Sequence, residues 1–555
     1  MGVATVALIQ CISVLQDILF ARSGDLDRVS WLANKSDWTI VLAPVLGGVV
    51  VGLILRQMPG HRFHGIADVM EASALRAGKM DVRSGGIVGL ATLVSLGSGA
   101  PLGREGPAVH IGASLTAWLA EQLGLGRTQS ITLLGCAVAA AVTASFNTPI
   151  AGVLFALEVV IGYYSLRVFA PVVVSAMGAV IVRHSVYGNL PEFVLPDFAI
   201  GSLWELLAFA LLGFIAALLV QCFITMVIFT QWSWQKTGIP VWYRPAVAGV
   251  VIGGIALAYP LILGVGYEGT SLALNEQLEV QLLVGLLVAK LVGASLALGS
   301  SFAGGVFSPA LFIGAMLGGA FWFLLNTIVP LETSSQGVYS VVGMAAVASA
   351  MLGAPISTLL IVFELTVDYD LVIAVMLSSA MASTFMQLMP HSSFFRWQLA
   401  KRRINLSTGR DQSLLRTRTI DNLVTQNYIE VGPQASLLDI ESAMFAVKRY
   451  IAVVINDEKD FVGSLSTDEI VAGNVRDGRD TQCEAVMKPI THAIPTSTNL
   501  LAALQVFNEL GSNYAPITRT GEESVEVIGV IYKSDVLKAL YELVREARAE
   551  EYGVN

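Results

Sequence analysis

Charged residues are scarce in this sequence of 555 residues: Asp, Glu, Lys and Arg together make up 14% of it, whereas 54% is hydrophobic. Soluble domains carry about a quarter charged residues, so most of the chain does not fit that class. The charges are sparse up to about residue 400 and return at soluble density beyond it. The net charge of −9 leaves no basic surface for nucleic acid. We therefore expect a membrane domain followed by a soluble domain.

Cysteine is also scarce, since the chain has only four: Cys11, Cys136, Cys222 and Cys483. Their scattered positions fit neither a disulfide framework nor the spacing of a zinc site, and we predict no metal site. The apolar segment 3–20 lacks the basic start and the small-residue cleavage site of a signal peptide. We therefore expect this segment to be a retained membrane helix.

Long apolar runs are frequent before residue 400. A helix needs about 20 mostly apolar residues to cross a bilayer core of about 30 Å. The segments that we expect to span the membrane are 38–55, 165–186, 203–229, 245–263, 282–298, 305–328, 338–352 and 371–388. Shorter apolar pieces cut by glycine and proline, such as 107–119 and 149–162, lie between them. Interrupted helices at membrane depth are tolerated where the freed backbone lines a site, which indicates a transport pathway.

Two parts of this region resemble each other in sequence. Residues 96–113 match residues 298–315 at an offset of 202 (299 − 97), and residues 149–163 match residues 355–369 at an offset of 206 (355 − 149). Chance similarity between Gly- and Ala-rich helices is the alternative. Two ordered matches at nearly one offset favour duplicated halves, which are typical of transporters.

The segment 97–107 (GSGAPLGREGP) is a Gly-rich loop followed by a helix that we expect to begin at Pro107. Free N–H groups and the positive helix end can bind an anion without a full cation. The repeat supplies a second such helix start at 304–309. Two helix N-termini directed at one spot would form a single anion pocket.

Glu105 stands out in this segment because a carboxylate there competes with an anion for the same donors. It would block the pocket until protonation releases it, which couples opening to pH. An ionisable residue inside the membrane is functional by default. The alternative is a simple helix cap in which Glu105 pairs with Arg104.

Three segments have the character of family signatures: 103–107 (GREGP), 146–152 (FNTPIAG) and 304–309 (GGVFSP). They closely resemble the signature segments of the CLC family of chloride channels and chloride/proton antiporters, and the resemblance covers essentially residues 1–400. It implies an all-α polytopic membrane domain of two inverted repeats with broken helices. It also implies a homodimer with one anion pathway in each subunit.

The same resemblance implies roles for single residues. Glu105 is the gating glutamate, and Arg104 and Gly106 beside it are expected to take part in anion binding. The backbone amides of Val306 and Phe307 are expected to face the central anion.

Two positions depart from the family pattern at the inner anion site. The family often has a Gly-Ser-Gly-x-Pro loop where this chain has 63–67, so His64 replaces the serine beside Gly65. A neutral imidazole can still donate one hydrogen bond, and its protonation would add pH sensitivity; a merely packed histidine is the alternative. The family's tyrosine at the start of the last membrane helix is matched by Phe395. We therefore expect anion coordination to depend more on backbone N–H groups.

The predicted function is transport of chloride or another small anion through a pathway gated by Glu105. Exchangers of the family typically have an inner glutamate directly after the position of Glu158, where this chain has Val159. This favours a channel, although His64 could replace the missing carboxylate in a chloride/proton antiporter. A carrier of fluoride, nitrate or bicarbonate is another alternative. We expect Glu158 and Glu364, which occupy equivalent places in the two halves, to make structural hydrogen bonds.

The sequence gives less support to functions other than transport. The membrane part has no His-Glu-x-x-His or Gly-x-Ser-x-Gly motif, so we do not expect an enzyme. A nucleotide receptor with a membrane anchor would not need duplicated broken helices. We expect membrane lipid and inorganic anions as partners, no nucleic acid and no obligatory cofactor.

A cluster of basic residues between 396 and 418 follows the last apolar segment. By the positive-inside rule, the chain beyond it is cytosolic, and we expect the protein in the plasma (inner) membrane. The expected organisation is a membrane domain at 1–400, a basic linker at 401–419 and two α/β units at 420–477 and 483–545.

The two α/β units have similar patterns of strand, helix, strand and helix start, including predicted strands at 451–455, 461–463 and 525–531. They look like the paired CBS domains that are common in this family and often bind adenine nucleotides. The resemblance implies that Asp535, with Ser534 beside it, contacts the ribose. The first unit has Glu469 at the comparable place.

Overall fold

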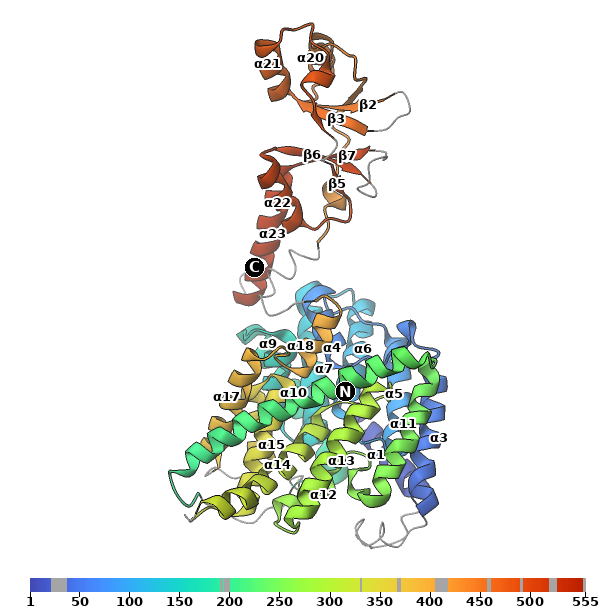
Figure 1. The fold of residues 1–555 in the computed structure, drawn as a ribbon, viewed down its shortest axis with the longest axis vertical. Helices are drawn as coiled ribbons and strands as arrows, with labels where there is room; N and C mark the ends of the chain where they lie inside the picture. The colour runs from blue at the N-terminus through green and yellow to red at the C-terminus, as the bar shows by residue number, and fades with distance from the viewer. Residues whose placement is uncertain are drawn as a thin grey trace. The chain divides into compact units, whose positions relative to one another are not determined.

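The computed structural model describes residues 1–20, 37–189, 193, 200–329, 332–366, 371–404, 418–456, 461–489, 493–518 and 527–552. The chain divides into two compact units, Met1–Leu406 and Ser407–Asn555. Where the first unit is described, it consists of helices and their connections; the second contains two small sheets with helices (Figure 1). Most of the predicted basic linker, 405–417, lies outside the described residues.

The first unit contains many helices, several of them short. They are α1 (Gly2–Leu19), α3 (Asp37–Leu55), η1 (Pro59–His61), α4 (Ile66–Leu75), α5 (Val82–Gly97), α6 (Glu105–Gln122), α7 (Arg127–Phe146), α8 (Pro149–Phe155), η2 (Ala156–Ile161), α9 (Leu166–Tyr187), α10 (Glu205–Thr237), η3 (Val241–Tyr243), α11 (Arg244–Ala258), η4 (Pro260–Ile262), α12 (Tyr267–Leu274), α13 (Val280–Gly299), α14 (Phe307–Ile328), α15 (Gln336–Leu352), α16 (Pro355–Thr366), α17 (Val372–Leu388) and α18 (Phe394–Lys401). The long helix α10 runs obliquely across this unit (Figure 1).

Among the described residues, eight helices are long and apolar enough to cross a membrane. They include the predicted N-terminal helix and α7, which the sequence analysis missed. The missed helix begins with polar residues and is apolar mainly through alanine, so its hydrophobic run is weak, although 83% of its most apolar window is buried. The predicted span 245–263 is shorter than expected, since α11 ends at Ala258 before Pro260. The predicted spans 338–352 and 371–388 form helices of 17 residues each.

The duplicated halves predicted from the sequence are visible as matching helices. The pair α5–α6 corresponds to α13–α14, and the pair α7–α8 corresponds to α15–α16. The halves meet at Gly103 and Gly305, where each N–H donates to the other residue's carbonyl, at 2.8 and 2.7 Å. These two glycines are related by the same offset of 202 (305 − 103), so the bridge lies where the two repeats meet.

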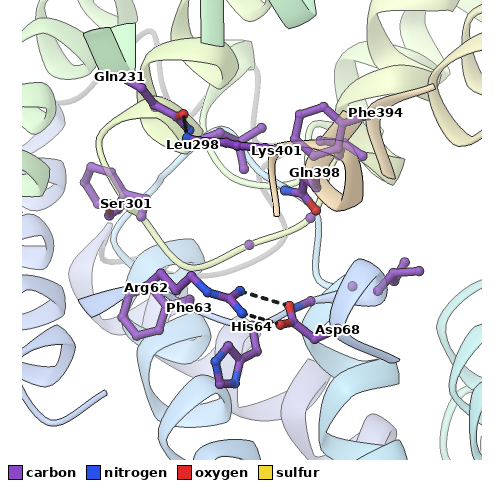
Figure 2. Close-up of a pocket in the computed structure, with 18 of the residues that line it drawn as sticks. Arg62, Phe63, His64, Asp68, Gln231, Leu298, Ser301, Phe394, Gln398 and Lys401 are labelled. Atoms are coloured by element: carbon purple, nitrogen blue, oxygen red, sulfur yellow. Dashed lines mark hydrogen bonds and ion pairs between the residues drawn. The ribbon is translucent and has the colours of Figure 1, made fainter. Parts of the chain in front are cut away.

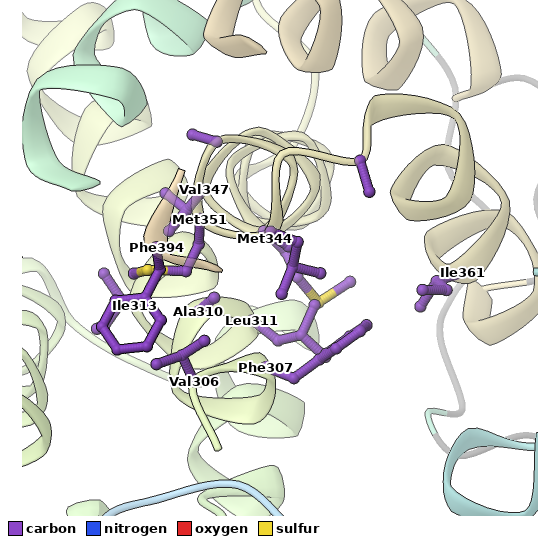
Figure 3. Packing of buried hydrophobic residues seen from close by; sticks show 14 of the residues in the cluster. Val306, Phe307, Ala310, Leu311, Ile313, Met344, Val347, Met351, Ile361 and Phe394 are labelled. Atoms are coloured by element: carbon purple, nitrogen blue, oxygen red, sulfur yellow. The ribbon is translucent and has the colours of Figure 1, made fainter. Parts of the chain in front are cut away.

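Helices α14 and α15 form the closest-packed part of the core. A Cβ atom added at Gly314 would lie 2.5 Å from the carbonyl oxygen of Gly343, so only glycine permits this approach. Small residues generally allow membrane helices to pack this closely. Figure 3 shows the side chains of Val347 and Met351 facing α14. The first turn of this closely packed helix is part of the site described below.

The second unit repeats one topology twice. The first copy is β1 (Ile429–Val431), α20 (Leu437–Val447), β2 (Ile451–Ile455), β3 (Phe461–Ser466) and α21 (Thr467–Arg476), and the second is β5 (Ile494–Pro495), α22 (Leu500–Leu510), β6 (Tyr514–Thr518), β7 (Val527–Tyr532) and α23 (Lys533–Tyr552). In each copy the first strand pairs in parallel with the second, and the second pairs antiparallel with the third. The strand β4 (Lys488–Pro489) extends the first sheet. The predicted strands are confirmed as β2, β3 and β7, except that 525 and 526 lie outside the described residues.

Candidate anion pathway

A cavity of about 430 Å³ lies inside the helical unit (Figure 2). Six of the predicted site residues line it, from four separate parts of the sequence: His64, Gly65, Gly106, Val306, Phe307 and Phe395. Arg104 and Glu105 are not among its lining residues. The fold therefore brings together most of the residues that the sequence analysis selected.

The wall of this cavity is rich in positive charge. Arg62, Arg244, Lys401 and Arg402 line it, whereas Asp68 is its one carboxylate. Arg62 and Arg402 both pair with Asp68, at 2.7 and 2.9 Å, and Figure 2 shows the first of these pairs beside His64. Because the cations outnumber the carboxylate, the cavity attracts anions. The sequence analysis did not find this feature, since the four cations come from three separate segments.

Gly65 contributes less than expected. It precedes α4, and its N–H donates to Oδ2 of Asp68 at 2.9 Å. This N–H group is therefore already bonded within the protein, while Gly65 itself lies on the cavity wall, and its role in anion binding stays a prediction. His64, next to it, lies with its ring 5.4 Å from the ring of the buried His110.

The first turns of α6 and α14 form the second part of the site. The sequence analysis predicted that this helix begins at Pro107. The helix α6 begins instead at Glu105, and Pro107 is its third residue. The first N–H groups of a helix have no partner within that helix. Gly106 in α6 and Phe307 in α14 present such groups, and the Gly103–Gly305 bridge holds the two helix starts together. The predicted convergence of two helix N-termini is thus present.

Glu105 lies between these helix starts and is 1% exposed. Its Oε1 accepts hydrogen bonds from Oγ of Ser308 at 2.6 Å and from the hydroxyl of Tyr267 at 3.2 Å. Its Oε2 has no hydrogen-bond partner among the described residues. Arg104, at the N-cap of α6, makes no side-chain cap hydrogen bond and donates to the carbonyl of Ser145 at 3.3 Å. A buried carboxylate with one unpartnered oxygen is costly.

Glu158 and Glu364 confirm the structural role that the sequence analysis predicted. Glu364 accepts hydrogen bonds from the N–H groups of Ile150 and Ala151 at the start of α8, at 3.0 and 2.7 Å. Glu158 accepts from the N–H groups of Ile356 and Ser357 at the start of α16, at 3.2 and 2.7 Å. Each repeat thus supplies the carboxylate that caps a helix of the other repeat.

Known proteins resemble the chain along most of its length. Residues 47–387 match the family model described as voltage gated chloride channel, and residues 483–542 match the CBS domain model. A putative chloride channel protein, ClcB-like, from Ralstonia nicotianae is 30% identical over 384 residues, which cover 68% of this chain and 89% of that protein. The chain belongs to the CLC family. The voltage-gated ClC-type chloride channel ClcB of Escherichia coli is 27% identical over 394 residues, 70% of this chain and 93% of that protein.

Solved CLC structures share the fold at 19% sequence identity. A slow cyanobacterial Cl⁻/H⁺ antiporter matches with a TM-score of 0.62, over 72% of this chain and 95% of its own. A eukaryotic CLC transporter matches with a TM-score of 0.59 over 96% of both chains. A CLC-type fluoride/proton antiporter matches with a TM-score of 0.58, over 69% of this chain and 91% of its own. The chain is therefore an integral membrane protein with the CLC fold and a C-terminal CBS domain.

The structure places two residues that the sequence analysis singled out as departures from the family pattern. Phe395 is buried near the start of α18 and lines the cavity without a hydroxyl. Val159 is buried in η2, next to Glu158. Two residues that contact Glu105 were missed. Ser308 lies inside the quoted motif 304–309, but its side chain was not considered, and Tyr267 belongs to no motif.

The predicted nucleotide-contacting residues of the second CBS unit and the residue at the comparable place in the first unit differ in their surroundings. Ser534 and Asp535 lie in the first turn of α23, where Ser534 is exposed and Asp535 is half-buried. Glu469 accepts from the backbone of Ser466 and pairs with Lys488 at 2.9 Å. Burial alone would raise the pKa of Glu469, but the hydrogen bonds from Lys488 and Ser466 hold that pKa below its usual value. The carboxylate of Glu469 is thus already engaged.

Proposed function

We propose that the membrane domain transports chloride through one pathway in each subunit of a homodimer and that Glu105 gates it. The observation that supports this most directly is the buried Glu105 carboxylate between the first turns of α6 and α14. An anion and this carboxylate compete for the same positive helix ends. Protonation of Glu105 weakens its hold on these donors, and an anion takes its place.

The binding residues that we propose follow from the position of the cavity. His64 supplies a side-chain donor, and Gly106, Val306 and Phe307 supply backbone N–H groups. Phe395 shapes the wall without donating. Arg104 acts on the site through Tyr267, because its guanidinium lies 5.2 Å from the centre of that ring.

Passive conduction is the mechanism that we favour. Val159 is apolar and buried at the place where exchangers of the family typically have an inner glutamate. A second candidate is a chloride/proton antiporter with a different proton route, which is supported by His64 on the cavity wall and by its contact with His110. Transport of fluoride, nitrate or bicarbonate is a third candidate, supported by the replaced donors at His64 and Phe395.

The organisation that we propose places the transport domain at 1–400 and a basic linker at 401–419. The units 420–477 and 483–545 form a tandem CBS pair, which is supported by their repeated topology. The pair is cytosolic, and the protein lies in the plasma membrane. An adenine nucleotide binds at Asp535 and Ser534 in the second unit, whereas the equivalent Glu469 is engaged by Lys488.

The test is to reconstitute the full chain in liposomes and to follow chloride efflux and external pH together. We expect chloride efflux without coupled proton movement. Uphill proton uptake driven by the chloride gradient would establish the antiporter in place of the channel. Fluoride or nitrate flux without chloride flux would show that the transported anion is not chloride. ATP on the side of the tail should alter the efflux rate of the wild type, and an equal effect of ATP on D535N would contradict the nucleotide site.

A further inference from the structure

The contacts of the Glu105 carboxylate show which groups bind a negative charge at this place. Two hydroxyl groups donate to Oε1, from Ser308 at 2.6 Å and from Tyr267 at 3.2 Å. They come from different helices, α14 and α12, and meet at one oxygen atom. Hydrogen bonds to a charged acceptor are about twice as strong as neutral ones. An anion that replaced this oxygen atom would find both donors in place.

Ser308 is well positioned to bind an anion from the α14 side. It is the second residue of α14 and is 1% exposed, and its hydroxyl has no acceptor other than Glu105 among the described residues. A Cβ atom added at Gly103 would lie 2.5 Å from Oε2 of Glu105 and 3.1 Å from the backbone nitrogen of Ser308. The carboxylate and this backbone nitrogen therefore both lie against Gly103, where only glycine leaves room. The hydroxyl and the backbone nitrogen of Ser308 thus both lie close to the Glu105 carboxylate.

Tyr267 is held in place from several sides. It is the first residue of α12 and follows Gly266, whose φ of +90° favours glycine. The guanidinium of Arg104 lies over its ring at 5.2 Å, and the ring of Phe193 packs against it edge-on at 5.8 Å. Because these contacts fix the ring, its hydroxyl remains directed at the same place when Glu105 leaves.

At the inner cavity, two of the donors that the family pattern predicts are missing or already bonded. Phe395 has no hydroxyl, and the N–H of Gly65 is bonded to Asp68. His64 is the one replaced position that keeps a donor. The position of Glu105, by comparison, has two hydroxyl donors that meet at one oxygen atom.

We propose that Ser308 and Tyr267 are the side-chain ligands of the transported anion at the position of Glu105 and determine its selectivity there. When Glu105 is protonated and moves away, chloride occupies the place of Oε1 and accepts the same two hydrogen bonds. Short O–H donors in a confined space favour a small anion over a larger one such as nitrate. This assignment rests on the proposed function, since it requires that an anion passes this point.

The experiment uses the full chain with Glu105→Ala, so that the hydroxyls of Ser308 and Tyr267 no longer donate to a carboxylate. Ser308→Ala and Tyr267→Phe are added separately, because each removes one oxygen atom and little else. Chloride affinity is measured by calorimetric titration, and the ratio of chloride to nitrate flux is measured in liposomes. Each added substitution should raise the chloride dissociation constant about tenfold and lower the flux ratio. Two separate variants keep the test decisive if one of them fails to fold.

Matched controls remove hydroxyls elsewhere in the same unit. Ser378→Ala removes a buried hydroxyl that donates to backbone carbonyls of α15 and α17, and Tyr259→Phe removes one next to Gly285. Both should leave the chloride affinity of the Glu105→Ala parent unchanged. Equal chloride affinity in the parent, S308A and Y267F proteins would overturn the assignment, because the hydroxyls would then serve only Glu105. A parent protein without any anion flux would instead refute the proposed function itself.

Discussion

At the scale of single residues, the central feature of the site is a carboxylate of which one oxygen atom accepts hydrogen bonds and the other does not. Oε1 of Glu105 has two hydroxyl donors, whereas Oε2 has no partner among the described residues. Leaving a buried acceptor unpaired costs about 1–3 kcal/mol, and more when it is charged. The charged carboxylate is therefore held weakly enough that protonation or a competing anion displaces it.

Lys290 is a second residue that contributes to the site, because it holds the segment that precedes Tyr267 in the chain. It is fully buried in α13, and its Nζ donates to the carbonyls of Ile262 and Gly264 at 2.7 and 2.8 Å. These carbonyls belong to the connection that leads directly into α12. Lys290 acts as a positioning residue for Tyr267 and, through it, for Glu105.

Replacing Lys290 by methionine should loosen this connection and weaken the Tyr267–Glu105 contact. The hydroxyl of Tyr267 donates one of the two hydrogen bonds that hold the Glu105 carboxylate in place, so its loss should change how chloride flux depends on pH. Lys290→Arg keeps the charge and the donors and should restore the wild-type midpoint. The measurement is chloride flux in liposomes as a function of pH. Midpoints that are equal in wild type and K290M would contradict this role, even if K290M is less stable.

At the scale of elements, the two repeats brace each other. The N-terminus of α16 is capped by Glu158 from the first repeat, and the N-terminus of α8 is capped by Glu364 from the second. A carboxylate at a helix N-terminus is stabilised by the helix dipole and by charge-assisted hydrogen bonds. This exchange explains why both positions are glutamate at equivalent places in the sequence.

Glu158→Gln and Glu364→Gln should each destabilise the protein by about 1–3 kcal/mol, since each removes the charge but keeps a weaker acceptor. The two effects should not add fully, because both carboxylates stabilise the same helix pair. Thermal unfolding of the purified protein in detergent measures this. Glu121→Gln, at an exposed position near the end of α6, is the control and should have no effect. Unfolding temperatures for E158Q and E364Q that equal the control would contradict the bracing role.

At the scale of the whole molecule, the repeated sequence predicted the architecture well. The sequence offset of 202 indicated the duplicated halves, and the structure adds a backbone bridge between the equivalent glycines Gly103 and Gly305, which the sequence analysis did not predict. The helix α7 escaped detection because alanine gives a weak hydrophobic signal although the helix is buried. The sequence analysis also did not predict the hydrogen bond from the N–H of Gly65 to Asp68 or the contacts of Ser308 and Tyr267 with Glu105. These contacts depend on which side chains the fold brings together.

The most direct test of the central claim is chloride flux as a function of pH for wild type and Glu105→Ala in liposomes. In the wild type, flux should rise as the pH falls, because protonation removes the negative charge that competes with the anion. In E105A, flux should be present at every pH and independent of it, while the exposed control Glu121→Ala should behave like the wild type. An unchanged pH dependence in E105A would contradict the gating role of Glu105.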